Sequence, residues 1–197
     1  MLPVLNLSSF EQADLIAQLM KEANLTYLEI TLRNDNAMTV LSHLLSNYPD
    51  LVVGVGTITN SDSLFSVADS GAHFGVTPGM NSALYAAMDK SSLPIIPGVS
   101  TISEAMEAME HGCDYVKLFP ASQIGLKTVK SWSGPLQNVS ICATGGLNFD
   151  SAKQWLDIPQ VKMVGGGWMA PKESLEKAVN GDAESLEILR QNFQQLY

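Results

Sequence analysis

Residues 114–120 have the sequence DYVKLFP, which is typical of a buried β-strand that ends at a proline. The aromatic and β-branched residues fit a sheet, but Lys117 has no packing reason to lie among them. An ammonium group is costly to bury unless it is paired or loses its proton, and a neutral amine is the nucleophile that forms Schiff bases with ketones. Lys117 is therefore a candidate nucleophile. The alternative is a lysine at a strand end with its charged head in solvent.

The composition indicates a globular chain, which we treat as one domain over residues 1–197. Of the 197 residues, 46% are hydrophobic and 16% are charged, enough for a sizeable core. The formal net charge of −9 argues against a nucleic-acid partner, and no run approaches the roughly 20 apolar residues of a membrane helix. With no secretion signal, and with Cys113 and Cys142 forming neither a disulfide framework nor a metal cluster, we expect a cytoplasmic protein without a metal.

Short β-branched runs alternate with longer amphipathic segments about eight times along the chain. This alternation predicts an α/β fold of the (β/α)8 TIM-barrel type, with a doubly wound open sheet as the competing architecture. The barrel is favoured because glycines and polar residues follow nearly every strand, as loops around one mouth require. The predicted strands are 2–7, 27–32, 51–57, 73–77, 94–99, 114–120, 139–144 and 161–164.

In a barrel of this type, the residues at the carboxyl ends of the strands face the active site. Glu29, Thr31 and Arg33 alternate along the second predicted strand, so their side chains point to the same face. Glu29 is a candidate proton shuttle, and a salt bridge to Arg33 or Lys117 is the structural alternative. Arg33 at the strand end suits a bidentate grip on a carboxylate.

Glycines follow both of the last two predicted strands. Gly145 and Gly146 follow the seventh strand, and Gly165, Gly166 and Gly167 follow the eighth. Backbone N–H groups that no side chain covers are the usual phosphate site of this fold, in the loops after its last strands. Turns need glycine anyway, so one cluster alone is weak evidence, but two consecutive clusters favour a phosphate site. The three histidines lie away from the mouth and are predicted to be structural.

Six motifs then carry a resemblance to the 2-keto-3-deoxy-6-phosphogluconate (KDPG) and 4-hydroxy-2-oxoglutarate (KHG) aldolases. They occur in the order and spacing of that family over nearly the whole chain. The motifs are LEITLR at 28–33, GVGT at 54–57, VTPG at 76–79, IPGVST at 96–101, VKLFPA at 116–121 and TGG at 144–146. The resemblance implies a class I aldolase on a (β/α)8 barrel, usually a homotrimer, which needs no cofactor beyond the Schiff base on its lysine.

The resemblance also implies roles for individual residues. Lys117 matches the Schiff-base lysine, and Glu29 matches the acid/base that handles the protons. Arg33, Thr57 and the backbone at Thr77 and Pro78 match the grip on the pyruvyl carboxylate, while the glycines match the phosphate end. The full set of implied substrate-binding residues is Arg33, Thr57, Thr77, Pro78, Phe119, Thr144, Gly145, Gly146, Gly166 and Gly167.

Two departures from the family pattern stand out. Gly167 occupies a position where the family often has a serine, so a hydroxyl that would face the phosphate is missing. The first strand begins almost at Met1, so a leading helix that is common in the family, where it covers the barrel floor, is either missing or lies outside this sequence.

The predicted reaction is cleavage of KDPG to pyruvate and glyceraldehyde 3-phosphate, with KHG, which gives pyruvate and glyoxylate, as a further substrate. The alternatives are a 2-keto-3-deoxy-6-phosphogalactonate aldolase, a phosphate-binding barrel without aldolase activity, and a non-catalytic ligand-binding barrel. The predicted partner is a small 2-keto acid, with neither nucleic acid nor membrane.

Overall fold

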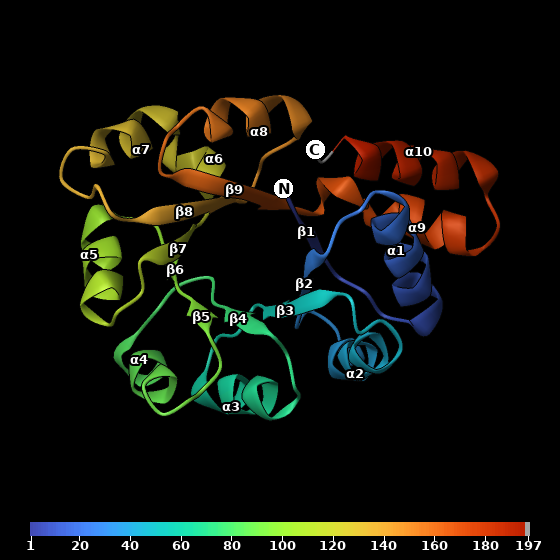
Figure 1. Cartoon of the computed structure of the whole chain (residues 1–197), viewed down its shortest axis with the longest axis horizontal. Helices are drawn as coiled ribbons and strands as arrows, with labels where there is room; N and C mark the ends of the chain where they lie inside the picture. The colour runs from blue at the N-terminus through green and yellow to red at the C-terminus, as the bar shows by residue number, and fades with distance from the viewer. Residues whose placement is uncertain (196–197) are drawn as a thin grey trace.

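The strands form one sheet that curls into a nearly closed barrel, with the helices packed around its outside (Figure 1). This is a computed structural model, and it describes residues 1–195. The strands are β1 Leu2–Leu5, β2 Tyr27–Thr31, β3 Val52–Gly56, β4 Phe74–Val76, β5 Ile95–Ile96, β6 Gly98–Val99, β7 Tyr115–Leu118, β8 Ser140–Thr144 and β9 Val161–Gly166. Neighbours follow the order β5-β4-β3-β2-β1-β9-β8-β7-β6, and every pair is parallel. The predicted (β/α)8 barrel is therefore confirmed, and the open sheet is wrong.

The helices alternate with the strands, and several begin at a side chain that accepts a hydrogen bond from the first turn. Ser9 caps the first helix in this way, and Thr101 forms a capping box with Glu104. The helices are α1 Phe10–Glu22, α2 Ala37–Asn47, α3 Ser61–Asp69, α4 Ser82–Met88, α5 Ile102–Glu110, α6 Ala121–Ile124, α7 Leu126–Trp132, α8 Phe149–Leu156, α9 Lys172–Val179 and α10 Ala183–Gln194, with a 3-10 turn, η1, at Gly167–Met169. None of these helices, all within residues 1–195, is long and apolar enough to cross a membrane.

The fifth predicted strand is divided in two at Pro97, which has no N–H to donate to a sheet. Before the proline, β5 pairs with β4, and after it β6 pairs with β7. The N–H of Thr77 donates to the carbonyl of Ile96 (3.2 Å), and the N–H of Lys117 donates to the carbonyl of Pro97 (2.9 Å). Together β5 and β6 take the place of one barrel strand, and the ring closes at this corner.

Two other segments differ from the prediction. β9 continues to Gly166 instead of ending at Val164, because Gly166 keeps an extended backbone with φ of 176°. The segment between the sixth and seventh predicted strands has no element assigned to it from sequence, although α6 and α7 lie there. Gly125, with φ of +83°, separates these two helices, and each is too short to show a clear helical period.

The core lies between the barrel and the helices, in two apolar clusters. On β2, Leu28 and Ile30 face outward into one of them and are 0% and 1% exposed. Because side chains alternate along a strand, Glu29 and Thr31 face the barrel interior. The second cluster is formed by the strands and helices of the second half of the chain, from β6 to β9.

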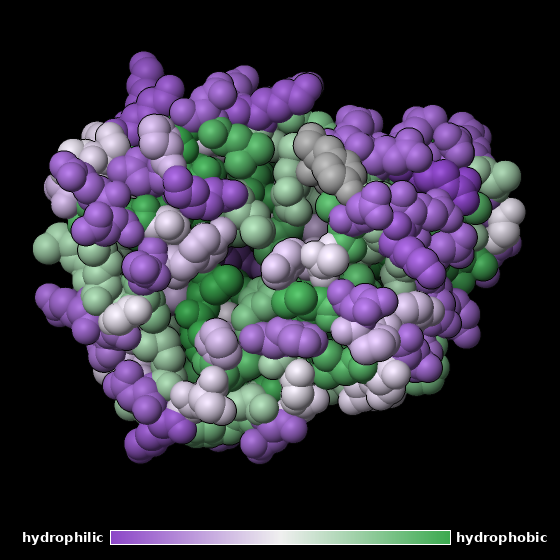
Figure 2. Space-filling view, in the orientation of Figure 1, coloured by the Kyte–Doolittle hydropathy of each residue, from purple (hydrophilic) through white to green (hydrophobic). Residues whose placement is uncertain are grey.

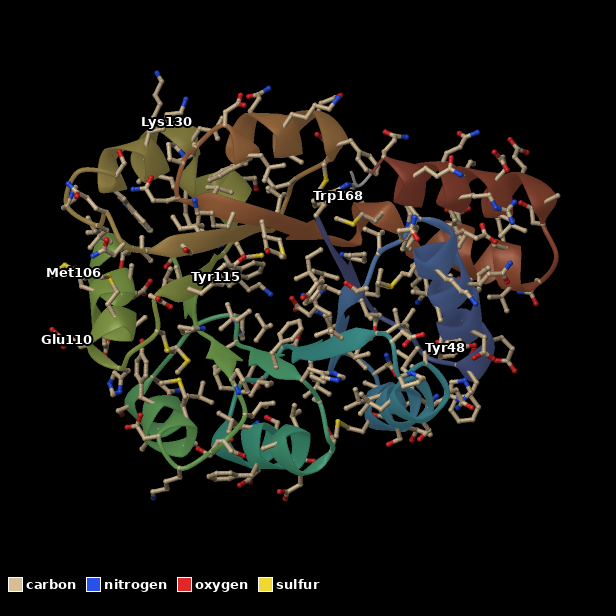
Figure 3. The ribbon with its side chains drawn as sticks, viewed as in Figure 1. Tyr48, Met106, Glu110, Tyr115, Lys130 and Trp168 are labelled. Carbon is tan, nitrogen blue, oxygen red and sulfur yellow. The ribbon has the colours of Figure 1, made fainter. Side chains whose placement is uncertain are left out.

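Figure 1 looks along the barrel from the end at which the strands begin, so the carboxyl ends of the strands lie on the far side. In the same orientation, Figure 2 shows a hollow at the centre of this face, with hydrophilic atoms at its bottom and hydrophobic side chains around it. On the outer surface, Met106 of α5 points away from the barrel and is 51% exposed (Figure 3). The predicted mouth therefore lies opposite the face shown.

Candidate active site

Lys117 and Glu29 meet inside the barrel from opposite sides of the ring. Lys117 lies on β7 and Glu29 on β2, and the distance from Lys117 Nζ to Glu29 Oε1 is 3.2 Å. The two residues are 5% and 1% exposed, so water reaches neither freely. The ion pair that sequence reasoning left as a structural alternative is thus present. It also places a carboxylate within proton-transfer distance of the amine, as acid–base chemistry requires.

Phe119 and Cys142 complete the surroundings of the amine. Lys117 Nζ lies 5.6 Å from the centre of the Phe119 ring, a favourable cation–π distance. Cys142 is paired with Lys117 in the β7–β8 ladder, and burial raises the pKa of its thiol to about 11. The thiol is therefore neutral at ordinary pH, where it adds an uncharged wall beside the lysine.

Arg33 lies two residues beyond β2, the strand that carries Glu29, and Thr57 directly follows the neighbouring strand β3. Arg33 is exposed beyond the end of β2, and within residues 1–195 it forms no ion pair. Thr57 follows β3 with φ of +67°, a left-handed conformation that is unfavourable for a β-branched residue. Strain of this kind is concentrated at functional sites, so Thr57 is held where an unconstrained chain would not place it.

The predicted role of Thr77 and Pro78 needs revision. Thr77 is fully buried, and its N–H is already used in the bond to Ile96, while Pro78 has no N–H. The Thr77 hydroxyl accepts a bond from the N–H of Gly98 (2.9 Å) and lies 3.2 Å from Met80 Sδ. The backbone at these two residues therefore offers no N–H donor to a carboxylate.

Gly145 and Gly146 form a turn after β8 that only glycine adopts without strain. Their φ angles are +100° and +70°, and within residues 1–195 neither N–H donates to another protein group. The Phe119 ring lies against Gly145, about 3 Å from where a side chain would begin. These two N–H groups, in consecutive left-handed residues of a turn, are available to an anion beside that ring. Thr144, one residue earlier, is buried inside the barrel.

Gly166 and Gly167 do not form the turn after the last strand that the sequence predicts. Gly166 is the last residue of β9, and a side chain there would overlap the ring of Trp168, which follows β9 (Figure 3). Packing of Trp168 thus explains this glycine without a phosphate. Gly167 is exposed at the start of η1, where a side chain would come 3.3 Å from the carbonyl oxygen of Val4.

Sequence reasoning missed two polar residues at the mouth. Asn6 follows β1 in phase with Val4, and its Oδ1 accepts a hydrogen bond of 2.6 Å from Asn34 Nδ2. The rule that polar residues at the carboxyl ends of barrel strands face the active site would have identified Asn6. Ser122 donates its N–H to the carbonyl of Gly145 (3.1 Å), and its hydroxyl fills the space beside Gly146. No sequence signal points to that contact.

The remaining candidates lie away from this site. His43 Nε2 is 2.6 Å from Asp14 Oδ1, His73 Nδ1 accepts the N–H of Val53, and the His111 ring stacks on Tyr85. A groove of about 890 Å³ runs outside the barrel between α1, α2 and the end of α9, and no predicted site residue lines it. No group of three or more metal-ligating side chains occurs in the described part of the chain.

The fold and the buried pair define the chain as a (β/α)8 barrel with an amine and a carboxylate at its centre. The family described as "KDPG and KHG aldolase" matches residues 1–186. A 2-dehydro-3-deoxy-phosphogluconate aldolase of Pseudoalteromonas atlantica is 35% identical over 175 residues, which cover 88% of this chain and 81% of that protein.

Two solved structures have closely similar folds. A KDPG aldolase from Legionella pneumophila, with pyruvate captured as a covalent carbinolamine intermediate, has a TM-score of 0.91 and 31% identity, and the match covers 99% of this chain and 92% of that one. The KDPG aldolase of Zymomonas mobilis ZM4 with 3-phosphoglycerate has a TM-score of 0.86 and 30% identity, over 99% and 90% of the two chains. The chain belongs to the KDPG and KHG aldolase family.

Proposed function

We propose that the protein is a class I aldolase that cleaves 2-keto-3-deoxy-6-phosphogluconate to pyruvate and glyceraldehyde 3-phosphate, with 4-hydroxy-2-oxoglutarate as a second substrate. The observation that carries this proposal is the distance of 3.2 Å between Lys117 Nζ and Glu29 Oε1 in the closed interior of the barrel. Family membership and the carbinolamine in the similar Legionella structure support it. No cofactor is required, because the lysine itself forms the covalent intermediate.

The reaction begins when Glu29 takes a proton from the Lys117 ammonium group, and the resulting neutral amine attacks the C2 ketone of the substrate. Glu29 supplies a proton to the departing hydroxyl, and water leaves to give an iminium. In this proposal Arg33 holds the carboxylate of the substrate by two parallel hydrogen bonds, with Thr57 beside it and Pro78 shaping the wall. These contacts fix the ketone over the amine.

Cleavage then uses the iminium as an electron sink. Glu29 takes the proton of the C4 hydroxyl, directly or through a water, while the C3–C4 bond breaks and its electrons enter an enamine. The aldehyde departs, the enamine is protonated at C3, and hydrolysis of the iminium releases pyruvate and the free lysine.

The phosphate of the substrate is proposed to bind at Gly145 and Gly146. Their unpaired N–H groups lie next to Phe119, on the side of the barrel that carries Lys117. The Zymomonas relative, whose structure contains 3-phosphoglycerate, supports a phosphate site in this family. Gly166 and Gly167 complete the predicted set, with the weaker support described above.

We also propose a homotrimer in the cytoplasm. The trimer rests on the family resemblance, and sedimentation or light scattering should give about three times the chain mass of 21.2 kDa. The cytoplasmic location is supported by the two cysteines, both of which are free.

Turnover distinguishes the proposal from its alternatives. Pyruvate release is measured with KDPG, with its C4 epimer 2-keto-3-deoxy-6-phosphogalactonate, and with KHG. The proposal predicts the highest kcat/KM for KDPG. Preference for the epimer would reassign the substrate, and no release from any of the three would refute the aldolase.

A further inference from the structure

We propose that Gly56 is a positioning residue: its missing side chain leaves the space that the Glu29 carboxylate must occupy to reach Lys117. The inference rests on the proposed function, since it assigns Gly56 a role in the acid–base step. It concerns the carboxylate alone and not the binding of either end of the substrate.

The space behind the carboxylate is defined by β2 and β3, which are neighbours in the sheet. Glu29 is paired with Gly54, and Thr31 with Gly56, so Gly56 lies one layer closer to the mouth than Glu29. A methyl group built on Gly56 would overlap Glu29 Oε1 and lie 2.6 Å from Glu29 Cδ and 3.0 Å from Cγ. The carboxylate therefore lies directly against the Cα atom of Gly56.

Backbone conformation does not explain this glycine. Gly56 is an extended strand residue, and its φ is not among the left-handed values found at Gly145 and Gly146. Glycine inside a strand weakens the strand, and it often marks a place where another group approaches closely. The group that approaches here is Oε1, the same atom that contacts Lys117 Nζ at 3.2 Å.

The carboxylate has little freedom to avoid a side chain at this position. Glu29 is 1% exposed, and its neighbours inside the barrel include Thr31, which is 2% exposed and donates to the carbonyl of Leu5 (3.2 Å). Alanine at position 56 would force the carboxylate to move from its place beside Lys117, because Glu29 Oε1 occupies the space of the added methyl group. A displacement of about 1 Å is enough to disrupt a proton transfer of this kind.

Gly54 provides a matched control on the same strand and the same face. A methyl group there would overlap the ring of Phe74, and the three atoms nearest to it all belong to that ring. Gly54→Ala therefore perturbs the barrel interior by the same chemical change as Gly56→Ala, but through a different neighbour.

The test is a double-mutant cycle on pyruvate release from KDPG, with Gly56→Ala, Glu29→Ala and the two combined. Gly56→Ala should lower kcat by roughly 10²–10⁴-fold, as loss of a general acid–base group does. In the Glu29→Ala background it should lower kcat by less than about twofold, because the carboxylate that it displaces is gone. Gly54→Ala should have the same fold effect in both backgrounds. The pH profile of Gly56→Ala should take the shape of the Glu29→Ala profile.

Several outcomes would overturn the proposal. Gly56→Ala with kcat within a few fold of the wild type would show that the carboxylate does not need the space. An equal loss in both backgrounds would show general distortion of the barrel. If Gly56→Ala fails to fold, the combined variant with Glu29→Ala should fold, and its failure would also overturn the inference. A wild-type protein that releases no pyruvate would refute the proposed function itself and this role with it.

Discussion

At the scale of single residues, the Lys117–Glu29 pair sets two opposite charges in a nearly dry interior. Desolvation of such a pair can cost more than the attraction returns, and replacing both partners with apolar groups is often neutral or stabilising. Stability alone therefore does not explain why this buried ion pair is present. Its place beside Phe119, whose ring also lies against Gly145, fits a role in a reaction.

This reasoning predicts that replacing the whole pair restores stability without restoring activity. Lys117→Met should lower the free energy of unfolding by about 3–5 kcal/mol, because it leaves the Glu29 carboxylate buried and unpaired. Lys117→Met combined with Glu29→Leu should recover most of that loss while turnover stays abolished. Thermal melts monitored by circular dichroism compare the stabilities of the two variants, and pyruvate release measures their turnover. A double variant as unstable as the single one would contradict the prediction.

Thr57 is predicted to be held at a cost in stability. Its φ of +67° carries strain of about 1–3 kcal/mol for a non-glycine residue, part of which glycine would relieve. Thr57→Gly should raise Tm by a few degrees and also raise the pyruvate concentration needed for half-maximal Schiff-base trapping. A fall in Tm would show that contacts of the threonine outweigh its strain.

Gly167 is predicted to limit the preference for phosphate. A Cβ atom there would lie 3.3 Å from the Val4 carbonyl oxygen, which is tight but tolerable with a small shift. Gly167→Ser should raise kcat/KM for KDPG by roughly 10-fold, as expected for an added hydrogen bond to a charged group. The kcat/KM for KHG, which carries no phosphate, should stay unchanged. Gly167→Ala adds the same carbon without the hydroxyl and should show no gain.

At the scale of elements, α1 and α2 are joined by one carboxylate. Asp14 of α1 accepts hydrogen bonds from Tyr48 Oη (2.7 Å) and His43 Nε2 (2.6 Å), which lie at the end of α2. Burial raises the pKa of Asp14, but these two bonds outweigh it and hold the net pKa below its usual value. The same contact raises the pKa of Tyr48 to about 12.

A carboxylate with a lowered pKa stabilises the fold above its unfolded pKa, and the effect is lost as the pH falls through the folded value. Asp14→Asn should therefore lower Tm at pH 7, and the difference in Tm should shrink as the pH falls below the ordinary aspartate pKa of about 4. The loss in free energy of unfolding should not exceed about 1 kcal/mol, since Asp14 is half exposed and solvent screens its charge. A Tm difference that does not depend on pH would contradict this account.

The elements themselves were largely predictable from periodicity and caps. The strands predicted at 27–32 and 139–144 match β2 and β8 to within one residue, and Gly71, with φ of +84°, ends the α3 segment as a left-handed glycine should. The failures have local causes. Pro97 splits a strand that looks continuous in sequence, Gly125 divides a helix into two short pieces, and Gly166 stays extended where a glycine cluster suggests a turn.

At the scale of the whole molecule, the barrel brings together residues that are 88 positions apart in sequence, such as Glu29 and Lys117. Alternation along β2 predicts which side chains face inward. The distance across the ring and the use of the Thr77 N–H in the sheet are set by the closure of the barrel. Close approaches such as Glu29 against Gly56 also depend on that closure, so no local pattern reveals them.

The central claim is that Lys117 forms a Schiff base with a 2-keto acid. The most direct measurement is reduction with borohydride in the presence of pyruvate, followed by peptide mass mapping. The account predicts a reduced pyruvyl adduct on Lys117 in the wild type and none in Lys117→Arg, which keeps the charge but cannot form the imine. No adduct on folded wild-type protein, or an adduct on another lysine, would contradict it.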